Sequence, residues 1–222
     1  MSDHTTKERI LIAAISIVER EGIGAIRMRR IASDAGVNTA AVNYHFGSRA
    51  NLISAVLHAS MGHAVDDWAM VMRTEGLGPA ARLHCLLHLL LEGISRYPGM
   101  VRTHLFDPDV RDLATAAFAR EFSSFLDMAA EELGGQVVPA KGSLRLSLAQ
   151  MITSTITVAL IPDLFRAATG GNLPEHEARE LHVSNLIRCF TGLEPNFSPL
   201  ERSIIDGLMS QAFSGSGVRG VT

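Results

Sequence analysis

The stretch VNTAAVNYHFGSRANL, residues 37–52, concentrates hydrogen-bonding side chains among small residues. The Asn43 amide offers one donor and one acceptor, the pair that matches the N6 and N7 edge of adenine, and the Thr39 methyl matches a thymine methyl. Tyr44 and Arg49 suit phosphate oxygens, which fix the position of a protein on DNA without reading its sequence. This pattern of side chains predicts contacts to bases flanked by contacts to phosphates.

Two short helices are predicted to position these side chains. The first covers about residues 28–35 and is closed by Gly36, and the second starts at Asn38, a good N-cap, and runs to about His45 before Gly47. Two short helices around a glycine turn form a helix-turn-helix arrangement. The predicted DNA-contacting residues are Arg29, Asn38, Thr39, Ala40, Asn43, Tyr44, His45 and Arg49.

Apolar spacing predicts which side of the second helix is outward. Val42 and Phe46 lie four residues apart and can pack on Ile31, which leaves Thr39 and Asn43 on the outer side. The helix N-terminus adds backbone N–H groups that favour an anion such as phosphate. A helical hairpin with a glycine turn also occurs in proteins that do not bind DNA, so the spacing alone leaves both interpretations open.

Composition and charge favour an all-α chain with a mildly basic N-terminal segment. Of the 222 residues, 47% are hydrophobic and 5% aromatic, and the apolar residues recur at helical spacing. The formal net charge is −3, but the first 60 residues carry seven Lys and Arg against five Asp and Glu. This segment is therefore at +2 and the remainder at −5, as expected for a basic head on an acidic body.

The helical pattern predicts two domains, a three-helix head at residues 1–52 and a larger helical domain at residues 53–222. The first helix, from Thr5 or Thr6 to Gly22, carries its apolar residues at i, i+3, i+4, i+7 and i+8. Further helices are predicted at about 48–76, 79–97, 109–133, 143–170, 174–193 and 199–213.

Neither the cysteines nor the apolar segments indicate a secreted or membrane protein. Cys85 and Cys189 lack the spacing of a metal site and are predicted to be packing residues in a reducing compartment. No apolar stretch has the length of a bilayer span, and the N-terminus lacks the apolar region of a signal peptide. We therefore expect a cytoplasmic protein without a membrane partner.

No motif of catalysis or of cofactor binding is present, so we predict neither an enzyme nor a cofactor. His84 and His88 are four residues apart and can share a metal ion, with His104 next in sequence, but no third ligand is fixed by the spacing. Two histidines on an amphipathic helix are more often surface or core residues. We predict no metal site.

An apolar helical body with scattered polar groups is the setting that a small-molecule pocket needs. Aromatic residues spaced at i, i+4 and i+7 and two methionines can line it, although the same spacing is also typical of a helix packed in the core. The predicted apolar lining is Phe118, Phe122, Phe125, Met128 and Met151, and the predicted polar anchors are Arg102, His104 and Thr155.

The first 52 or so residues resemble the TetR family of transcriptional regulators. The resemblance rests on the segments TTKERILIAAISIVEREG, IASDAGV and AAVNYHFGSRANL, which match the family pattern in order. Arg27 stands where the family usually has Thr or Ser, and Arg49 where it usually has Lys. Many members have Tyr where Asn43 stands, and here Tyr44 follows, so which of the two contacts a base is left open.

The resemblance implies a homodimer that reads a palindromic operator in double-stranded DNA. It also implies a C-terminal domain that binds a small-molecule effector, and we expect a repressor that leaves the operator when the effector binds. The dimer surface is predicted on the last two long helices, about 142–169 and 174–192. Their apolar residues, which can equally fill the core of one subunit, are Leu146, Ala149, Ile152, Ile156 and Leu186. The alternative is a helical carrier of small molecules without affinity for DNA.

Overall fold

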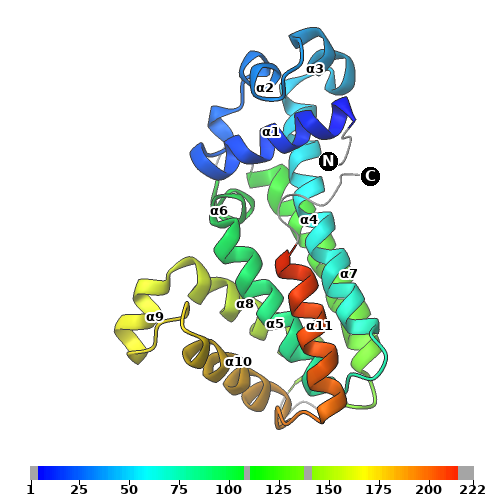
Figure 1. The fold of residues 1–222 in the computed structure, drawn as a ribbon, viewed down its shortest axis with the longest axis vertical. Coiled ribbons are helices and arrows are strands. Elements are labelled where there is room, and N and C mark those ends of the chain that lie inside the picture. Colours follow the sequence, from blue (N-terminus) through cyan, green and yellow to red (C-terminus); the bar gives the residue numbers. More distant parts are fainter. Residues whose placement is uncertain (1–4, 108–110, 138–141, 215–222) are drawn as a thin grey trace. The chain divides into compact units, whose positions relative to one another are not determined.

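The computed structural model describes residues 5–107, 111–137 and 142–214, and within these ranges the only regular secondary structure is helical (Figure 1). The prediction of an all-α fold is confirmed. The N-terminal elements are α1 (Thr6–Glu21), the 3-10 turn η1 (Ile23–Ala25), α2 (Met28–Asp34), α3 (Thr39–Phe46) and α4 (Arg49–Arg73). The later elements are α5 (Pro79–Arg96), α6 (Pro98–Phe106), α7 (Arg111–Leu133), α8 (Leu144–Leu160), α9 (Pro162–Thr169), α10 (His176–Thr191) and α11 (Pro199–Ser214).

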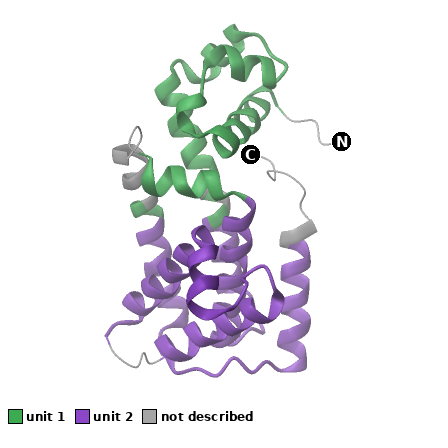
Figure 2. Cartoon of the chain, turned by 90° about the vertical axis from the view of Figure 1, so that its left-hand side faces the viewer, with its two compact units in different colours: residues 1–64, 97–121, 215–222 green, residues 65–96, 122–214 purple. Residues whose placement is uncertain are grey.

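The helices form two compact units, shown in Figure 2. Of the described residues, unit 1 contains 5–64, 97–107 and 111–121, and unit 2 contains 65–96, 122–137 and 142–214. Unit 1 therefore includes α6 besides the helix-turn-helix, and α4 and α7 each begin in unit 1 and end in unit 2. The functional boundary after residue 52 stays a prediction, because packing units need not coincide with functional domains.

Helix α1 begins with a capping box and supplies much of the core of unit 1. Thr5 Oγ1 accepts a hydrogen bond from the Glu8 N–H, and the Glu8 carboxylate accepts one from the Thr5 N–H. The predicted apolar stripe, Ile10, Ala13, Ala14, Ile17 and Val18, is buried together with residues of α2, α3 and the first half of α4. The first helix is thereby the base on which the helix-turn-helix packs.

Helix α6 is attached to the last turn of α1. The Glu19 carboxylate accepts hydrogen bonds from the N–H groups of Gly99 and Met100, at 2.9 and 2.8 Å. These are N–H groups of a first helical turn, which has no partners within its own helix. A Cβ atom at Gly99 would lie 2.3 Å from the Glu19 carbonyl oxygen, so only glycine permits this approach. Glu19 thus acts as an N-terminal cap supplied by another helix.

Unit 2 is organised around α5, which packs against α8, α10 and α11. Leu83, Leu87 and Leu91 are buried along α5, and Phe125 packs edge-on against Trp68 with ring centroids 5.3 Å apart. Cys85 is buried as predicted for a packing residue. Cys189 is exposed on α10, so the same prediction was wrong there.

The prediction of one continuous helix over residues 143–170 was wrong. Helix α8 ends at Leu160 and α9 begins at Pro162, with a bend of 98° between the two. Proline disfavours helical torsion angles in the residue before it. Ile161, which precedes Pro162, has φ −129° and ψ 60°. Among the described residues no single helix is long and apolar enough to cross a bilayer, and only this bent pair reaches that length and composition when taken together.

Candidate nucleic-acid interface

The helix-turn-helix is built by local backbone bonds. Gly36 takes the left-handed conformation with φ +63°, which lets the Val37 N–H donate to the Ala32 carbonyl at 2.9 Å. The Asn38 side chain accepts a hydrogen bond from the Ala41 N–H at 2.7 Å and so caps α3. Gly36 and the Asn38 N-cap occupy the positions at which the sequence predicted them.

The outer face of α3 contains four of the eight predicted DNA-contacting residues. Val42 and Phe46 are buried, as predicted from their spacing, and this orients the opposite face outward. Tyr44 is 86% exposed, and its ring meets His45 edge-on with centroids 5.3 Å apart. The residues that α3 exposes are Ala40, Asn43, Tyr44 and His45, whereas Thr39 is half-buried. The helix therefore presents an amide, a phenol and an imidazole beside a small residue.

Arg9 fixes the turn and was not predicted. Its Nη2 donates to the Ala35 carbonyl at 2.6 Å and to the Gly36 carbonyl at 2.9 Å, so the guanidinium caps the end of α2. A Cβ at Gly36 would lie 2.9 Å from this nitrogen. Arg9 lies 26 and 27 positions from these two partners in the sequence, so no local sequence pattern predicts the contacts.

The Arg49 side chain hydrogen-bonds to backbone carbonyls of unit 1. Its Nε donates to the Ile26 carbonyl at 3.0 Å and its Nη2 to the Ile23 carbonyl at 3.2 Å. Arg27, the N-cap of α2, makes no capping bond through its side chain and donates to the carbonyls of Gly24 and Ile26. Both arginines therefore satisfy carbonyls around η1, and a phosphate contact by Arg49 stays a prediction.

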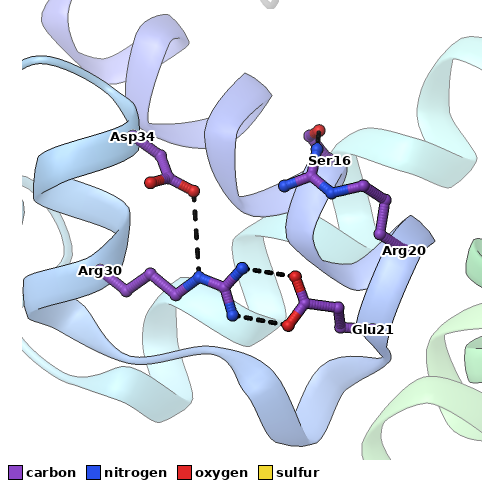
Figure 3. A network of polar contacts seen from close by, with 5 residues as sticks. All are labelled: Ser16, Arg20, Glu21, Arg30 and Asp34. Atoms are coloured by element: carbon purple, nitrogen blue, oxygen red, sulfur yellow. Dashed lines mark hydrogen bonds and ion pairs between the residues drawn. The ribbon is translucent and has the colours of Figure 1, made fainter.

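The two arginines of α2 lie in different surroundings. Arg30 forms an ion pair with Glu21 and lies 4.0 Å from the Asp34 carboxylate, while Arg20 donates to Ser16 nearby (Figure 3). The hydrogen bond with Arg30 lowers the pKa of Glu21. Arg29 is exposed, with no hydrogen bond or ion pair to any residue that the structure describes. Its charge is the one on α2 that is left for a phosphate.

The predicted ligand-lining residues are divided between the two units. In unit 1, His104 is buried, and its Nε2 lies 2.9 Å from Ser60 Oγ. Burial lowers the pKa of His104 to about 4, so the ring is neutral near pH 7. Arg102 is exposed on an open groove of about 320 Å³ lined by α1 and α6.

In unit 2, the predicted ligand-lining residues belong largely to the core. Phe125 and Met151 are buried, and the Thr155 hydroxyl donates to the Met151 carbonyl at 2.9 Å within its own helix. Phe122 and Met128 are half-buried, and the side chain of Phe118 lies outside the described residues. A pocket made from this set stays a prediction.

The apolar residues predicted for the dimer surface separate by burial. Ile152 and Ile156 are buried within the unit, Ala149 and Leu186 are half-buried, and Leu146 is 51% exposed. Three further apolar side chains, which the prediction omitted, are exposed: Ile161 just before α9, Leu164 on α9 and Leu181 on α10.

Comparison with known proteins identifies the N-terminal segment. Residues 10–56 match the family model described as "Bacterial regulatory proteins, tetR family". The curated "HTH-type transcriptional regulator BetI" of Rhizobium meliloti (strain 1021) is 28% identical over 83 residues. That alignment spans 37% of this chain and 40% of the relative.

Solved structures match over most of the chain. A putative TetR-family transcriptional regulator from Mesorhizobium loti MAFF303099 superposes with a TM-score of 0.65, at 17% identity, over 84% of this chain and 96% of that one. SmeT, the repressor of the Stenotrophomonas maltophilia multidrug efflux pump SmeDEF, gives 0.61 at 15% identity, over 89% and 96%. At these identities the similarity shows the fold. Residues 10–56 thus match the N-terminal segment of the tetR family of bacterial regulatory proteins, and the chain shares its fold with solved structures of such regulators.

Proposed function

We propose that this protein is a transcriptional repressor that binds a palindromic operator as a homodimer and leaves it when a small molecule binds the C-terminal domain. The observation that carries the DNA-binding part is the outer face of α3, where Asn43, Tyr44 and His45 are exposed while Val42 and Phe46 anchor the helix. A recognition helix presents such polar side chains to the major groove.

We assign recognition of the base sequence to the exposed positions of α3. The flanking groups are assigned to phosphate contacts, which set the position of the protein along the DNA. Asn43 has the amide geometry that pairs with adenine, and Ala40 allows close approach to the groove floor. Arg29 and the start of α3 face phosphates, since the first carries an uncompensated charge and the second free N–H groups. Tyr44, which is 86% exposed, is the alternative base contact.

The dimer is proposed to form through α8 and α10. Leu146 on α8 and Leu181 on α10 are large apolar side chains that are 51% and 60% exposed in the single chain. Apolar exposure of this kind is a common mark of a protein interface. A two-fold pair of helix-turn-helix units gives the spacing that a palindromic site requires.

The repressor role and the effector rest on similarity. SmeT, which has the same fold, is named as the repressor of a multidrug efflux pump. The body of this chain likewise is a helical unit separate from the helix-turn-helix. A ligand that binds it can release DNA only if it binds the released conformation more tightly than the DNA-bound one.

The test is a gel-shift titration against DNA flanking the coding region, with random competitor DNA, at two salt concentrations. We expect saturable binding that survives competitor and weakens as salt rises, with a two-fold symmetric footprint. The double variant N43A/Y44A should lose specific binding while retaining its helical circular dichroism. Loss of one good base contact costs about 1–3 kcal/mol.

The matched control is N196A, which removes an exposed asparagine in unit 2 and should bind the operator as the wild type does. If no specific site emerges even from a selection over random duplexes, the proposal is wrong. A helical carrier of small molecules would then be the better interpretation.

A further inference from the structure

Three metal-binding side chains meet in unit 2, outside the helix-turn-helix. His84 and His88 lie one helical turn apart on α5, and Glu180 faces them from α10. His84 Nε2 lies 3.0 Å from one Glu180 carboxylate oxygen, and His88 Nε2 lies 2.9 Å from the other. One ligand atom from each residue fits within a span of 4.8 Å. The third group that sequence spacing did not fix is thus supplied by another helix.

Both imidazoles are buried, and their hydrogen bonding is incomplete. Their side chains are 9% exposed. His84 Nε2 donates a hydrogen bond to the Glu180 carboxylate, yet its Nδ1 has no partner among the described residues. His88 Nε2, although 2.9 Å from the carboxylate, lacks the direction of a hydrogen bond and is likewise unsatisfied. A buried nitrogen with an unused lone pair is costly unless something binds it.

The carboxylate is not neutralised by the arginine beside it. Arg179 pairs with Glu92 at 3.6 Å and donates to the Leu173 carbonyl. The described partners of the Glu180 carboxylate are the two imidazoles; the hydrogen bond with His84 and the nearby His88 ring lower its pKa, so it remains anionic. Two imidazoles and one carboxylate oxygen are a donor set that suits divalent zinc and its neighbours.

The structure assigns, we infer, a binding site for a divalent transition-metal ion of the zinc type to His84, His88 and Glu180. Tetrahedral coordination at about 2.0–2.1 Å sets neighbouring ligand atoms about 3.3 Å apart. The two N···O separations here, 2.9 and 3.0 Å and each to a different carboxylate oxygen, lie a few tenths of an ångström below this distance, and the ligand atoms of the three residues lie within 4.8 Å of one another. The Glu180 side chain is 33% exposed, which gives the ion an entry path and a fourth position for water.

The surroundings hold the ligands in place. The Phe197 ring packs edge-on against His84, with centroids 4.8 Å apart, and restricts the imidazole's rotation. Because the histidines and the carboxylate come from different helices, a bound ion would cross-link α5 to α10. This site is independent of the proposed DNA contacts, which lie in unit 1.

The test is a titration of the full chain, without an affinity tag, with Co²⁺ followed by visible absorption. Exposed Cys189 is replaced by Ser to remove a competing thiolate. We expect one Co²⁺ per chain with the d–d bands of four-coordinate cobalt, displaced by Zn²⁺ and unaffected by Mg²⁺, which prefers oxygen ligands. At Zn²⁺ near 100 times Kd, the Tm should rise by about 5 °C or more.

Ligand variants decide between this site and a metal-free polar cluster. H84Q, H88Q and E180Q should each weaken Zn²⁺ binding by more than about tenfold, since mutating even an outer-shell partner of a metal ligand typically costs about 10–100-fold in affinity. H58Q, at an exposed histidine on α4, should bind as the parent does. Absence of saturable binding, or binding unchanged in the ligand variants, would overturn the assignment.

X-ray absorption of the zinc-loaded parent chain removes dependence on the folding of any variant. Scattering from two imidazoles and one oxygen ligand supports the site. A first shell without imidazole overturns it.

Discussion

The arginine side chains of unit 1 lie in three kinds of surroundings. Arg9 and Arg49 donate to backbone carbonyls and hold the turn and η1 in place. Arg30 forms an ion pair with Glu21. Arg29 remains exposed without a partner among the described residues. Only some of the arginine donors in this segment are therefore available for direct contacts to phosphate, although every arginine keeps its positive charge.

His104 makes the stability of the protein depend on pH. Burial lowers its pKa to about 4, whereas an unfolded histidine titrates near 6.5. The unfolded chain thus binds the proton more readily, so the stabilising contribution is complete above pH 6.5 and is lost as pH falls toward 4. Between pH 7 and pH 5 the free energy of unfolding should fall by roughly 2 kcal/mol from this residue.

The measurement is urea unfolding of wild type and H104Q at several pH values. Glutamine does not titrate and can still bond to Ser60, so H104Q should show a flatter dependence on pH than wild type. H58Q, which changes an exposed histidine, should keep the wild-type slope. Equal slopes for wild type and H104Q would show that the His104 pKa is not depressed.

Single residues were predictable where their causes are local. The Asn38 cap, the Gly36 turn and the inward face marked by Val42 and Phe46 can be predicted from residues close together in the sequence. Arg9 was missed because its partners lie 26 and 27 residues away. Tertiary packing decides whether an arginine side chain contacts a carbonyl, a carboxylate or solvent. Local sequence spacing does not predict this choice.

The attachment of α6 to α1 combines a cap with a close approach. Glu19 accepts from two N–H groups of α6, and Gly99 brings the backbones together. Substituting G99A places a methyl group 2.3 Å from a carbonyl oxygen and should destabilise the protein by about 1–3 kcal/mol through forced displacement.

The matched control is G93A, within α5, where a Cβ meets no atom within 4 Å. Since alanine is favoured over glycine in a helix, G93A should stabilise the protein by about 0.5–1 kcal/mol. Thermal denaturation of both variants measures the contrast. A neutral or stabilising G99A would mean that α6 does not approach α1 this closely.

Most helices were predicted from apolar periodicity, but their number was wrong at two places: α6 (Pro98–Phe106) was not predicted, and the break at Pro162 was missed. There the apolar pattern continues across the break, so periodicity alone read α8 and α9 as one helix. The rule that a residue before proline leaves helical conformation was the available signal. Glu180 could not be joined to His84 and His88 from sequence, since about 90 residues separate them and only the packing of α10 on α5 brings them together.

The proposed dimer makes the behaviour of the whole protein depend on α8 and α10. Replacing Leu181 with Arg sets a charge on an apolar patch that an interface would desolvate. We expect L181R to be monomeric in light scattering after size-exclusion chromatography, and to bind a two-half-site operator at least about tenfold more weakly, since each head then binds alone.

The control is L200R, at a leucine that is 64% exposed on α11, away from the proposed surface. It should remain dimeric and bind the operator normally. If L200R and not L181R yields monomers, the dimer forms through α11 and the proposed surface is wrong.

The Glu19 cap also makes two amides useful as reporters. Backbone N–H groups of a first helical turn ordinarily exchange freely with solvent, because no carbonyl of their own helix reaches them. Those of Gly99 and Met100 are held by a carboxylate from α1. Their hydrogen-exchange rates therefore measure how often the α1–α6 junction opens, residue by residue, in the native protein and under any added DNA or ligand.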